Sequence, residues 1–323
     1  MKKGRVGILR GGPSSEYDVS LRSGFHVMKN IPDDWDKRDI FIDKEGRWFL
    51  DGIEKSPEKI MRNFDVVFNA MHGEFGEDGK VQHILESYHM PFNGSRSIPS
   101  AMAMNKVKTK EILGLHGIKT PRFTYLRKHE YTYGDLAELY ARLSRPIVVK
   151  PAFAGSSIGI SLASSFEELV LAVNDAFKVS ETIILEEFIR GREATCGVLD
   201  NSNGSDVYAL YPIEIKYPGD KKIWDFESKY SDEKHTCLCP STFDTSIKKE
   251  IQKMSHMAHC IMELDHYSRS DFIVSDDGEV YFLEVNTLPG LTEGSLYPLA
   301  LKSAGIDMSH FLDHVLTLAI KRK

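Results

Sequence analysis

The chain has 323 residues, of which 41% are hydrophobic and 27% are charged, which is the composition of a folded globular protein. This length is large for a single hydrophobic core, so we expect two or three domains. The formal net charge of −6 comes without an acidic tail or a basic block. This argues against a nucleic-acid partner and suits a protein that binds small molecules.

Neither the N-terminus nor the cysteines suggest secretion. The apolar stretch that follows Met1–Gly4 is too short for a signal peptide, and no segment reaches the length of a membrane span. Four cysteines do not make a disulfide framework at this length, and Cys237-x-Cys239 lacks the spacing of a zinc site. We therefore expect a cytoplasmic protein without a membrane contact, whose cysteines are reduced and pack inertly.

The first part of the chain alternates short buried strands with helices. The predicted elements are strands at 5–9 and 65–70 and helices at 19–28 and 80–88. This order predicts a parallel sheet with helices on its faces. Ligands of such sheets gather at the carboxyl ends of the strands, so the loops after Leu9 and Ala70 are expected to line a ligand site.

A second unit follows after about residue 93. It begins with one long helix that ends before Gly117 and Pro121. The predicted elements are a helix at 100–116, strands at 123–126, 146–150, 158–160 and 182–189, and a helix at 166–177. The expected domains are therefore residues 1–92, 93–185 and 186–323.

The last part of the chain contains a long polar segment and a terminal helix. Residues 217–240 show no clean periodicity, which predicts a long loop, and long ordered loops often act as lids. Residues 308–320 carry an apolar stripe and predict a capping helix.

Two segments near the C-terminus predict a β-hairpin. Residues 269–274 and 280–286 are rich in aromatic and β-branched side chains, and Asp277-Gly278 between them is a strong two-residue turn signal. With that turn, Asp276 pairs with Glu279, and the same register continues outward along both strands.

This register places four polar side chains on one face of the hairpin. Asp271 lies opposite Glu284, and Arg269 lies opposite Asn286, because residues two apart on a strand point the same way. Facing carboxylates, roughly 5 Å apart at Cβ, repel each other unless a positive charge lies between them. The oxygens of Asp271, Glu284 and Asn286 therefore predict a site for Mg²⁺, with phosphates completing its shell; a solvated hairpin with scattered charges is the alternative.

A series of motifs in order resembles the D-alanine–D-alanine ligases of the ATP-grasp superfamily and covers the chain from end to end. The motifs lie at residues 11–16 with 19–24, at 72–79, at 149–160, at 229–231, and in the hairpin with its continuation to Pro298. The resemblance implies an α/β protein, in which an N-terminal Rossmann-like parallel sheet domain precedes a two-part ATP-grasp fold. Residues 186–323 would then carry the metal site and the lid.

The resemblance also implies how ATP is held. The matching positions are Lys106 and Lys150 for the phosphates, Ser157 in the phosphate loop, Glu186, Glu187, Phe188 and Ile189 at the adenine, and Glu193 at the ribose. Lys150 ends an apolar strand, where a charge without an anion nearby is costly. Lys106 shares its helix with Lys108 and Lys110, so a solvated lysine face is the alternative there, and Asn105 stands where the family commonly has Asp. A generic hairpin loop is the alternative for residues 154–159, whose glycines let backbone N–H groups approach phosphate.

For catalysis, the resemblance points to residues from every part of the chain. The matching catalytic positions are Glu16, Ser156, Tyr230, Arg269, Gly290 and Ser295, and the substrate-binding positions are His72, Lys229 and Leu296. Glu16 would bind the ammonium of the first D-alanine, although an N-cap neighbour of the following helix is the alternative. Arg269 and the N–H of Gly290 would stabilise the oxyanion, and Asp271, Glu284 and Asn286 would hold two Mg²⁺ or Mn²⁺ ions.

The expected activity is the ATP-dependent joining of two D-alanines, through D-alanyl phosphate, for peptidoglycan precursors. The candidate general base is a chain of Tyr230, Ser156 and Glu16, or the released phosphate. A D-alanine–D-lactate ligase is the nearer alternative, and a nucleotide-binding regulator without catalysis is the more distant one. The intact hairpin face argues against the regulator. ATP and D-alanine are the expected partners, and a homodimer is expected because the family usually forms one.

Overall fold

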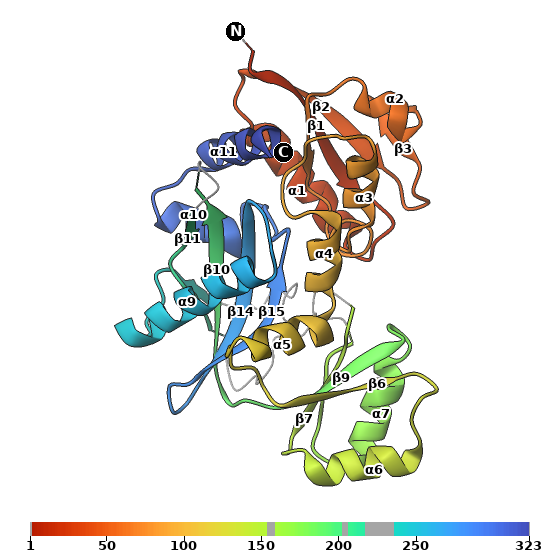
Figure 1. Cartoon of the computed structure of the whole chain (residues 1–323), viewed down its shortest axis with the longest axis vertical. Coiled ribbons are helices and arrows are strands. Elements are labelled where there is room, and N and C mark those ends of the chain that lie inside the picture. The colour runs from red at the N-terminus through yellow and green to blue at the C-terminus, as the bar shows by residue number, and fades with distance from the viewer. Residues whose placement is uncertain (1, 154–158, 202–205, 217–235, 323) are drawn as a thin grey trace.

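The computed structural model describes residues 2–153, 159–201, 206–216 and 236–322. Three β-sheets follow one another along the longest axis of the molecule, with the N-terminal sheet at one end and the C-terminal sheet in the middle (Figure 1). The predicted α/β class is therefore confirmed.

The first sheet has the order β4-β3-β2-β1-β5. Its strands are β1 (Gly4–Gly11), β2 (Trp35–Ile42), β3 (Trp48–Leu50), β4 (Ile53–Glu54) and β5 (Val66–Asn69), and its helices are α1 (Tyr17–Asn30), α2 (Pro57–Met61) and α3 (Lys80–Ser87). Strands β1 and β5 are parallel, as predicted, and β2, which was not predicted, also runs parallel to β1. The antiparallel edge formed by β3 and β4 was not predicted. The loops after β1 and β5 leave neighbouring strand ends, so they lie close together.

The single helix predicted for residues 100–116 is wrong, because the chain turns at Asn105. Two helices form instead, α4 (Ser97–Met104) and α5 (Lys106–Leu115). The backbone of Asn105 is extended, at φ −83° and ψ 95°, and its side chain accepts a hydrogen bond from the backbone N–H of Lys108. Asn caps helices about as well as Asp, so the departure from the family's Asp-Lys retains the cap. The turn places Lys106 at the first position of α5.

The second sheet is antiparallel, with the order β6-β9-β7-β8. Its elements are β6 (Phe123–Arg127), β7 (Ile147–Pro151), β8 (Ser161–Ala163), β9 (Thr182–Glu187), α6 (Tyr133–Arg142) and α7 (Phe166–Ala176). The strand predicted at 158–160 is wrong in its described part, because β8 starts only at Ser161. Gly159 has φ +74°, outside the region of extended strands. The domain boundary predicted near residue 185 falls inside β9.

The third sheet is also antiparallel, with the order β13-β12-β10-β14-β15 and β11 paired to β10. Its strands are β10 (Gly191–Asp200), β11 (Val207–Ala209), β12 (Ile213–Lys216), β13 (Thr236–Leu238), β14 (Tyr267–Ser275) and β15 (Val280–Asn286). Helix α9 (Thr245–Ile261) covers β10, β14 and β15. The long loop predicted at 217–240 lies mostly outside the described residues, and its end forms β13.

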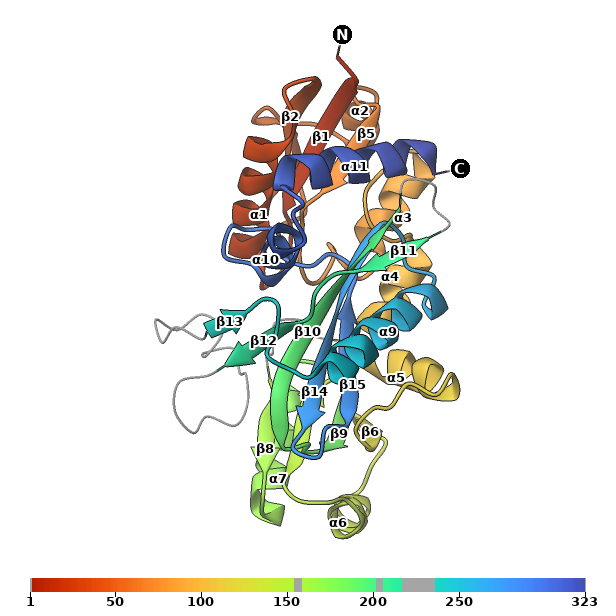
Figure 2. The same ribbon diagram turned by 90° about the vertical axis from the view of Figure 1, so that its left-hand side faces the viewer.

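Two C-terminal helices return toward the first sheet. They are α10 (Leu296–Ser303) and α11 (Met308–Lys321). Helix α11 packs on α1 and β5, as the second view shows (Figure 2). Val6 and Phe68 of the first sheet share a buried core with Phe311 and Val315 of α11. The C-terminal end of the chain therefore fixes the first sheet against the third.

The predicted hairpin forms, but its turn differs from the prediction. Ser275 pairs with Glu279 through their backbones, so the loop contains three residues rather than two. Gly278 has φ +87°, as the αL position of a three-residue hairpin requires. A register shift next to Asp271 then compensates, and Asp271 lies opposite Glu284 as predicted. Arg269 likewise lies opposite Asn286.

All four cysteines are free thiols. Burial raises the pKa of Cys196 to about 12. Within the described residues, no helix combines the length and apolarity needed to cross a membrane.

Candidate active site

The hairpin face gathers polar side chains from β10, β14 and β15. Arg269 binds Asp271 through two hydrogen bonds, with Nε 2.9 Å from Oδ1 and a terminal nitrogen 2.8 Å from Oδ2. Thr195 Oγ1 donates to the same carboxylate at 2.6 Å, and the amide nitrogen of Asn286 donates at 3.2 Å. Burial lowers the pKa of the Arg269 guanidinium, but Asp271 more than offsets this and raises it, so Arg269 remains charged. Both oxygens of Asp271 are thus held in place.

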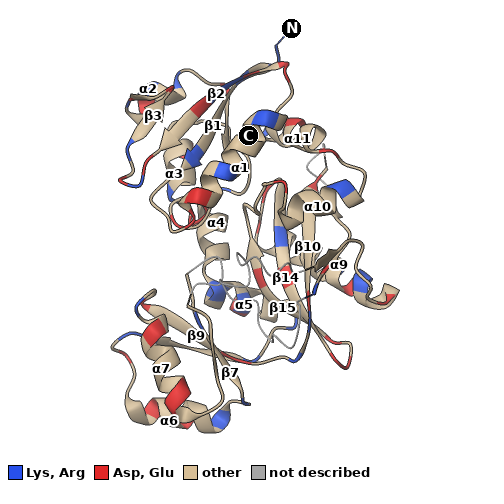
Figure 3. Ribbon diagram, turned by 180° about the vertical axis from the view of Figure 1, so that it is seen from behind, with Lys and Arg blue, Asp and Glu red and all other residues tan. Residues whose placement is uncertain are grey.

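The second carboxylate of this face meets a different cation. Lys106 Nζ lies 3.0 Å from Glu284 Oε2, and the Lys106 side chain is only 9% exposed. Basic segments of α5 therefore stand beside acidic segments of β14 and β15 (Figure 3). Among the described residues, each carboxylate of the facing pair contacts a side-chain cation, Arg269 for Asp271 and Lys106 for Glu284. This arrangement agrees with the argument that the pair requires positive charge.

The residues present fit a hard cation whose coordination shell is completed by oxygens of a bound ligand. Among the described residues, no three His, Cys, Asp or Glu side chains group together as metal ligands. The face instead offers two carboxylates and one amide, so phosphate oxygens and water would have to complete the shell of a metal ion. A cavity of about 20 Å³ adjoins Glu284 and Asn286, which is room for about one water-sized species.

A buried ion-pair cluster lies one turn further along the same face of α5. Lys150 Nζ is 2.8 Å from Glu186 Oε2, and Lys110 Nζ is 2.9 Å from Glu186 Oε1. Burial raises the pKa of Glu186, but the charges of Lys110 and Lys150 more than offset this and lower it. Burial also lowers the pKa of Lys110 to about 8. Glu186 Oε1 has a close cation but no well-aligned hydrogen bond, so it keeps acceptor capacity.

The predicted adenine segment continues from this cluster. Two of its backbone N–H groups are already hydrogen-bonded to residues beside the second sheet. Glu187 N donates to Arg122 O at 2.9 Å, and Phe188 N donates to Pro146 O at 3.2 Å. Phe188 and Ile189 are half-buried. Glu193 follows on β10, where it pairs with strands on both sides. The segment thus crosses from the second sheet to the third beside Lys150 and Glu186.

The loops after β1 and β5 meet around His72. Its Nε2 lies 2.7 Å from Ser23 Oγ and its Nδ1 lies 3.1 Å from the Leu288 carbonyl oxygen, with donor roles set by the tautomer. Burial lowers the pKa of His72, but the hydrogen bond and charge of Glu77, with Glu16 and the Leu288 carbonyl, more than offset this and raise it. Glu77 also accepts a hydrogen bond from the N–H of residue 73 at 2.8 Å.

Glu16 stands at this same junction. It occupies the N-cap position of α1, yet its side chain does not cap the helix in the described structure. Gly73 has φ +71°, and a Cβ placed on it would lie 2.5 Å from Ser14 Oγ and 3.3 Å from Glu16 Oε2. Only glycine permits so close an approach of the two loops. Glu16 thus stands at the start of α1, as the alternative expected, but its side chain makes no capping hydrogen bond.

The loop after β15 faces the first domain. His26 Nδ1 lies 2.6 Å from the carbonyl oxygen of Leu291. This is a second hydrogen bond between the first domain and this loop, beside the one that His72 makes with Leu288. A Cβ placed on Gly290 would lie 3.0 Å from Ser295 Oγ, so these two predicted residues adjoin. Ser295 Oγ is 2.7 Å from Thr292 Oγ1, and the buried Leu296 begins α10.

The structure brings most of the described residues of the predicted site together in two groups. One group comprises Lys106, Lys150, Glu186, Arg269, Asp271, Glu284 and Asn286, and the other comprises Glu16, His72, Gly290 and Ser295. The rest of the adenine segment (Glu187, Phe188 and Ile189) with Glu193 continues from the first group, and Leu296 follows Ser295. Ser156, Ser157, Lys229 and Tyr230 lie outside the described residues, so their predicted roles are not tested.

Several contact residues were not predicted, namely Ser23, Glu77, Lys110 and Thr195. A signal for Lys110 was present in the sequence. Residues four apart share a helix face, so Lys106 and Lys110 must point the same way while Lys108 points elsewhere. Lys108 is indeed exposed, and the other two are buried.

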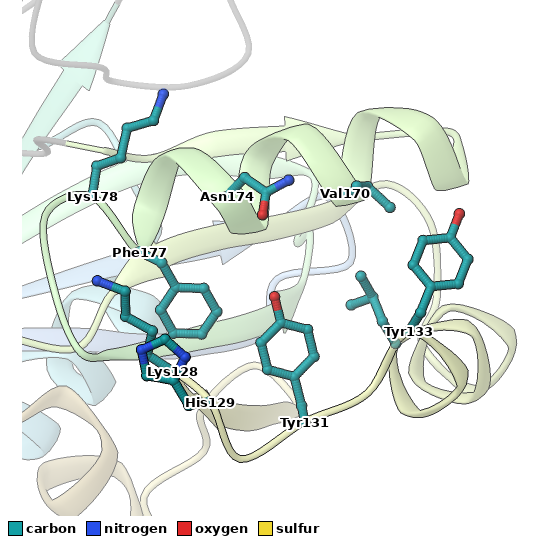
Figure 4. Close-up of a pocket in the computed structure, with 9 residues that line it drawn as sticks. Lys128, His129, Tyr131, Tyr133, Val170, Asn174, Phe177 and Lys178 are labelled. Carbon is teal, nitrogen blue, oxygen red and sulfur yellow. The ribbon is translucent and has the colours of Figure 1, made fainter.

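A larger pocket of about 560 Å³ lies away from these groups, between α6 and α7 (Figure 4). Its lining includes Tyr131, Tyr133 and Phe177 and none of the predicted site residues. Its lysines are already paired, Lys128 with Glu181 and Lys178 with its helix neighbour Asp175. We assign no chemistry to this pocket.

Comparison with known families matches almost the whole chain. The family described as D-ala D-ala ligase C-terminus matches residues 112–317, and the family described as D-ala D-ala ligase N-terminus matches residues 5–61 and 51–95. Among curated relatives, the D-alanine–D-alanine ligase of Geobacter sulfurreducens is 36% identical over 99% of this chain and 95% of its own length. That of Cupriavidus taiwanensis is 35% identical over 98% and 92%.

Solved structures agree with these matches. The D-alanine-D-alanine ligase from Coxiella burnetii superposes with a TM-score of 0.85 at 27% identity, covering 100% of this chain and 95% of that one. The VanG D-Ala:D-Ser ligase from Enterococcus faecalis gives a TM-score of 0.85 at 29% identity, covering 99% and 100%.

Proposed function

The chain belongs to the family of D-alanine–D-alanine ligases, and we propose that its site joins two D-alanines at the expense of ATP. The observation that carries this proposal is the face of the β14–β15 hairpin, where two opposed carboxylates, an amide and an arginine stand together in a chain that matches the family from end to end. The protein is an ATP-grasp enzyme, and its product, D-alanyl-D-alanine, serves peptidoglycan synthesis.

In the first step, a carboxylate oxygen of one D-alanine attacks the γ-phosphorus of ATP, and ADP leaves. Glu16 binds the ammonium of this D-alanine. His72, whose pKa is raised by the hydrogen bond and charge of Glu77, lies beside it as a second contact for the first substrate. Here the protein acts mainly by positioning the bound reactants and by stabilising charge. Lys106 and Lys150 bind the phosphates, and Glu186 to Ile189 with Glu193 bind the nucleoside.

Asp271, Glu284 and Asn286 would hold two Mg²⁺ or Mn²⁺ ions. The ions would supply charge that neutralises the phosphate oxygens. Lys106, which pairs with Glu284, would also contact the phosphates. The ion pairs of the hairpin face therefore keep the carboxylates and the phosphate-binding cations in one place.

In the second step, the amine of the other D-alanine attacks the carbonyl carbon of D-alanyl phosphate. The tetrahedral intermediate carries an oxyanion, which Arg269 and the N–H of Gly290 stabilise. Inorganic phosphate leaves, and the amine loses one proton. The proton acceptor is the series of side chains Tyr230, Ser156 and Glu16, or the released phosphate. Ser295 and Leu296 bind the carboxylate of this second substrate.

The acceptor is D-alanine rather than D-lactate. The curated relatives named above are D-alanine–D-alanine ligases, so the D-lactate alternative is not favoured. We place the reaction in the cytoplasm, where ATP is made, and the homodimer remains a prediction.

A coupled assay of phosphate release tests this function. The purified chain with ATP, Mg²⁺ and D-alanine is expected to release one phosphate for each dipeptide formed, whereas L-alanine gives neither product. Phosphate release without dipeptide would reduce the protein to an ATPase and contradict the proposal.

A further inference from the structure

Helix α5 presents two lysines to the interior, of which only Lys106 belongs to the predicted site. Lys110 lies one turn further along, and its side chain is 0% exposed. Lys108, between them, is 59% exposed and pairs with Glu111 on the surface. A fully buried ammonium is costly in free energy unless it is well paired. The presence of a lysine at position 110 therefore requires an explanation from its contacts.

The contacts of Lys110 join the two halves of the nucleotide site. Its Nζ lies 2.9 Å from Glu186 Oε1 on β9 and 3.4 Å from the Phe282 carbonyl oxygen on β15. Glu186 begins the predicted adenine segment, and Phe282 lies two residues before Glu284. The ring of Phe123 adds a cation–π contact, with its centre 5.9 Å from Nζ. Lys110 thus touches the second and the third sheet at once.

The charges of this cluster do not balance. Glu186 is the shared carboxylate of two ammonium groups, because its other oxygen binds Lys150 at 2.8 Å. A pair that served stability alone would need one lysine, and apolar residues of similar size often stabilise a core better than a buried ion pair. The excess positive charge instead suits a polyanion beside Lys150.

We propose that Lys110 is a positioning residue for ATP, which holds one oxygen of Glu186 so that the other oxygen fixes Lys150 toward the phosphates. Lys110 does not contact the nucleotide in this account. It acts through Glu186 and Lys150, and it keeps the cluster net positive. This inference rests on the proposed function, because it requires ATP at that place.

The test compares Lys110→Met with Lys108→Met, which removes a lysine from the exposed face of the same helix. ATP affinity is measured by calorimetry with Mg²⁺ and a non-hydrolysable ATP analogue, next to KM and kcat. Lys110→Met should weaken nucleotide binding and raise KM for ATP about 10-fold to 100-fold, as loss of an orienting partner typically does. KM for D-alanine should change little, and Lys108→Met should match the wild type.

A merely structural role gives a different result. Lys110→Met would then lower the melting temperature with unchanged nucleotide affinity, which overturns the inference. If Lys110→Met does not fold, Lys110→Gln replaces it. This variant keeps a donor for Glu186 but loses the charge, so it should still raise KM for ATP, by less than about 10-fold, and an unchanged KM would overturn the inference.

A double-variant cycle with Glu186→Gln tests the route of the effect. If Lys110 acts through Glu186, adding Lys110→Met to Glu186→Gln should cost little further affinity. Fully additive losses would overturn the inference. A wild-type protein that does not bind the analogue would instead refute the proposed function.

Discussion

Glu284 illustrates how one side chain can serve a reaction through its charge. Its carboxylate faces Asp271 across the hairpin and is held by Lys106. Both the position and the need for a cation could be predicted from the alternation of the two strands. That Lys106 supplies this cation could not, because α5 and β15 are far apart in sequence.

We expect Glu284→Gln to remove most activity and to leave the fold intact, because one of the facing carboxylates loses its charge and a metal ion binds more weakly. The Mg²⁺ concentration for half-maximal rate should rise roughly 10-fold or more. Rates measured over a series of Mg²⁺ concentrations check this, with the melting temperature as a test of folding. Glu279→Gln, at the exposed end of the same hairpin, is the control. Near wild-type turnover at limiting Mg²⁺ would contradict the assigned role.

His266 makes stability depend on pH in the acid range. Burial, with the charge of Arg322, lowers its pKa from 6.5 to about 3. The folded protein therefore keeps His266 neutral, while the unfolded chain takes up a proton below pH 6.5. The stability contributed by this difference is complete above pH 6.5 and is lost as the pH falls toward 3.

We expect His266→Asn to reduce this loss. Asn tolerates the positive φ of +67° and can accept the hydrogen bond that Gly94 N donates to Nδ1. Between pH 6.5 and 4.5 the variant should lose about 2 kcal/mol less free energy of unfolding than the wild type. Urea titrations across this range measure the difference. Equal slopes in both proteins would show that His266 does not titrate in this way.

At the scale of the element, the hairpin was predicted correctly for a partly wrong reason. An Asp-Gly dipeptide suits both a two-residue turn and a three-residue loop with glycine at the αL position. The structure has the longer loop, and the register shift beside Asp271 restores the predicted pairing. The edge-to-face packing of Phe272 on Phe282, with ring centres 5.7 Å apart, lies next to this shift. Such packing depends on α9 and could not be read from the strand sequences.

The break between α4 and α5 has a similar cause. The sequence around it carries no glycine or proline, so periodicity alone predicted one helix. Asn105 supplies the local signal, because Asn favours the N-cap position. The break matters for the site, since it directs Lys106 and Lys110 into the interior.

We expect Asn105→Ala to lower the free energy of unfolding by about 1 kcal/mol and Asn105→Asp to leave it nearly unchanged. Only the Ala variant loses the side-chain acceptor for Lys108 N. Because Lys106 is the first residue of α5, KM for ATP should also rise in the Ala variant. Equal stability of the two variants would show that the cap does not hold this helix.

At the scale of the whole molecule, the site depends on three sheets that the chain forms one after another. The loops after β1, β5 and β15 meet at Glu16, His72 and Gly290, and ties such as His26 to Leu291 close the junction. The parallel order of β1 and β5 predicted the first two loops as neighbours. The loop after β15 joins them because α11 packs on α1 and β5. Such long-range packing cannot be predicted from a local sequence pattern.

The central claim is that this assembled site makes D-alanyl-D-alanine through an acyl phosphate. Oxygen-18 in both carboxylate oxygens of D-alanine follows this route directly. One labelled oxygen of the donor should leave with the phosphate, and the other should remain as the carbonyl oxygen of the new amide. Mass spectrometry of the released phosphate should then find one oxygen-18 for each dipeptide formed. Unlabelled phosphate, or phosphate formed without dipeptide, would contradict the account.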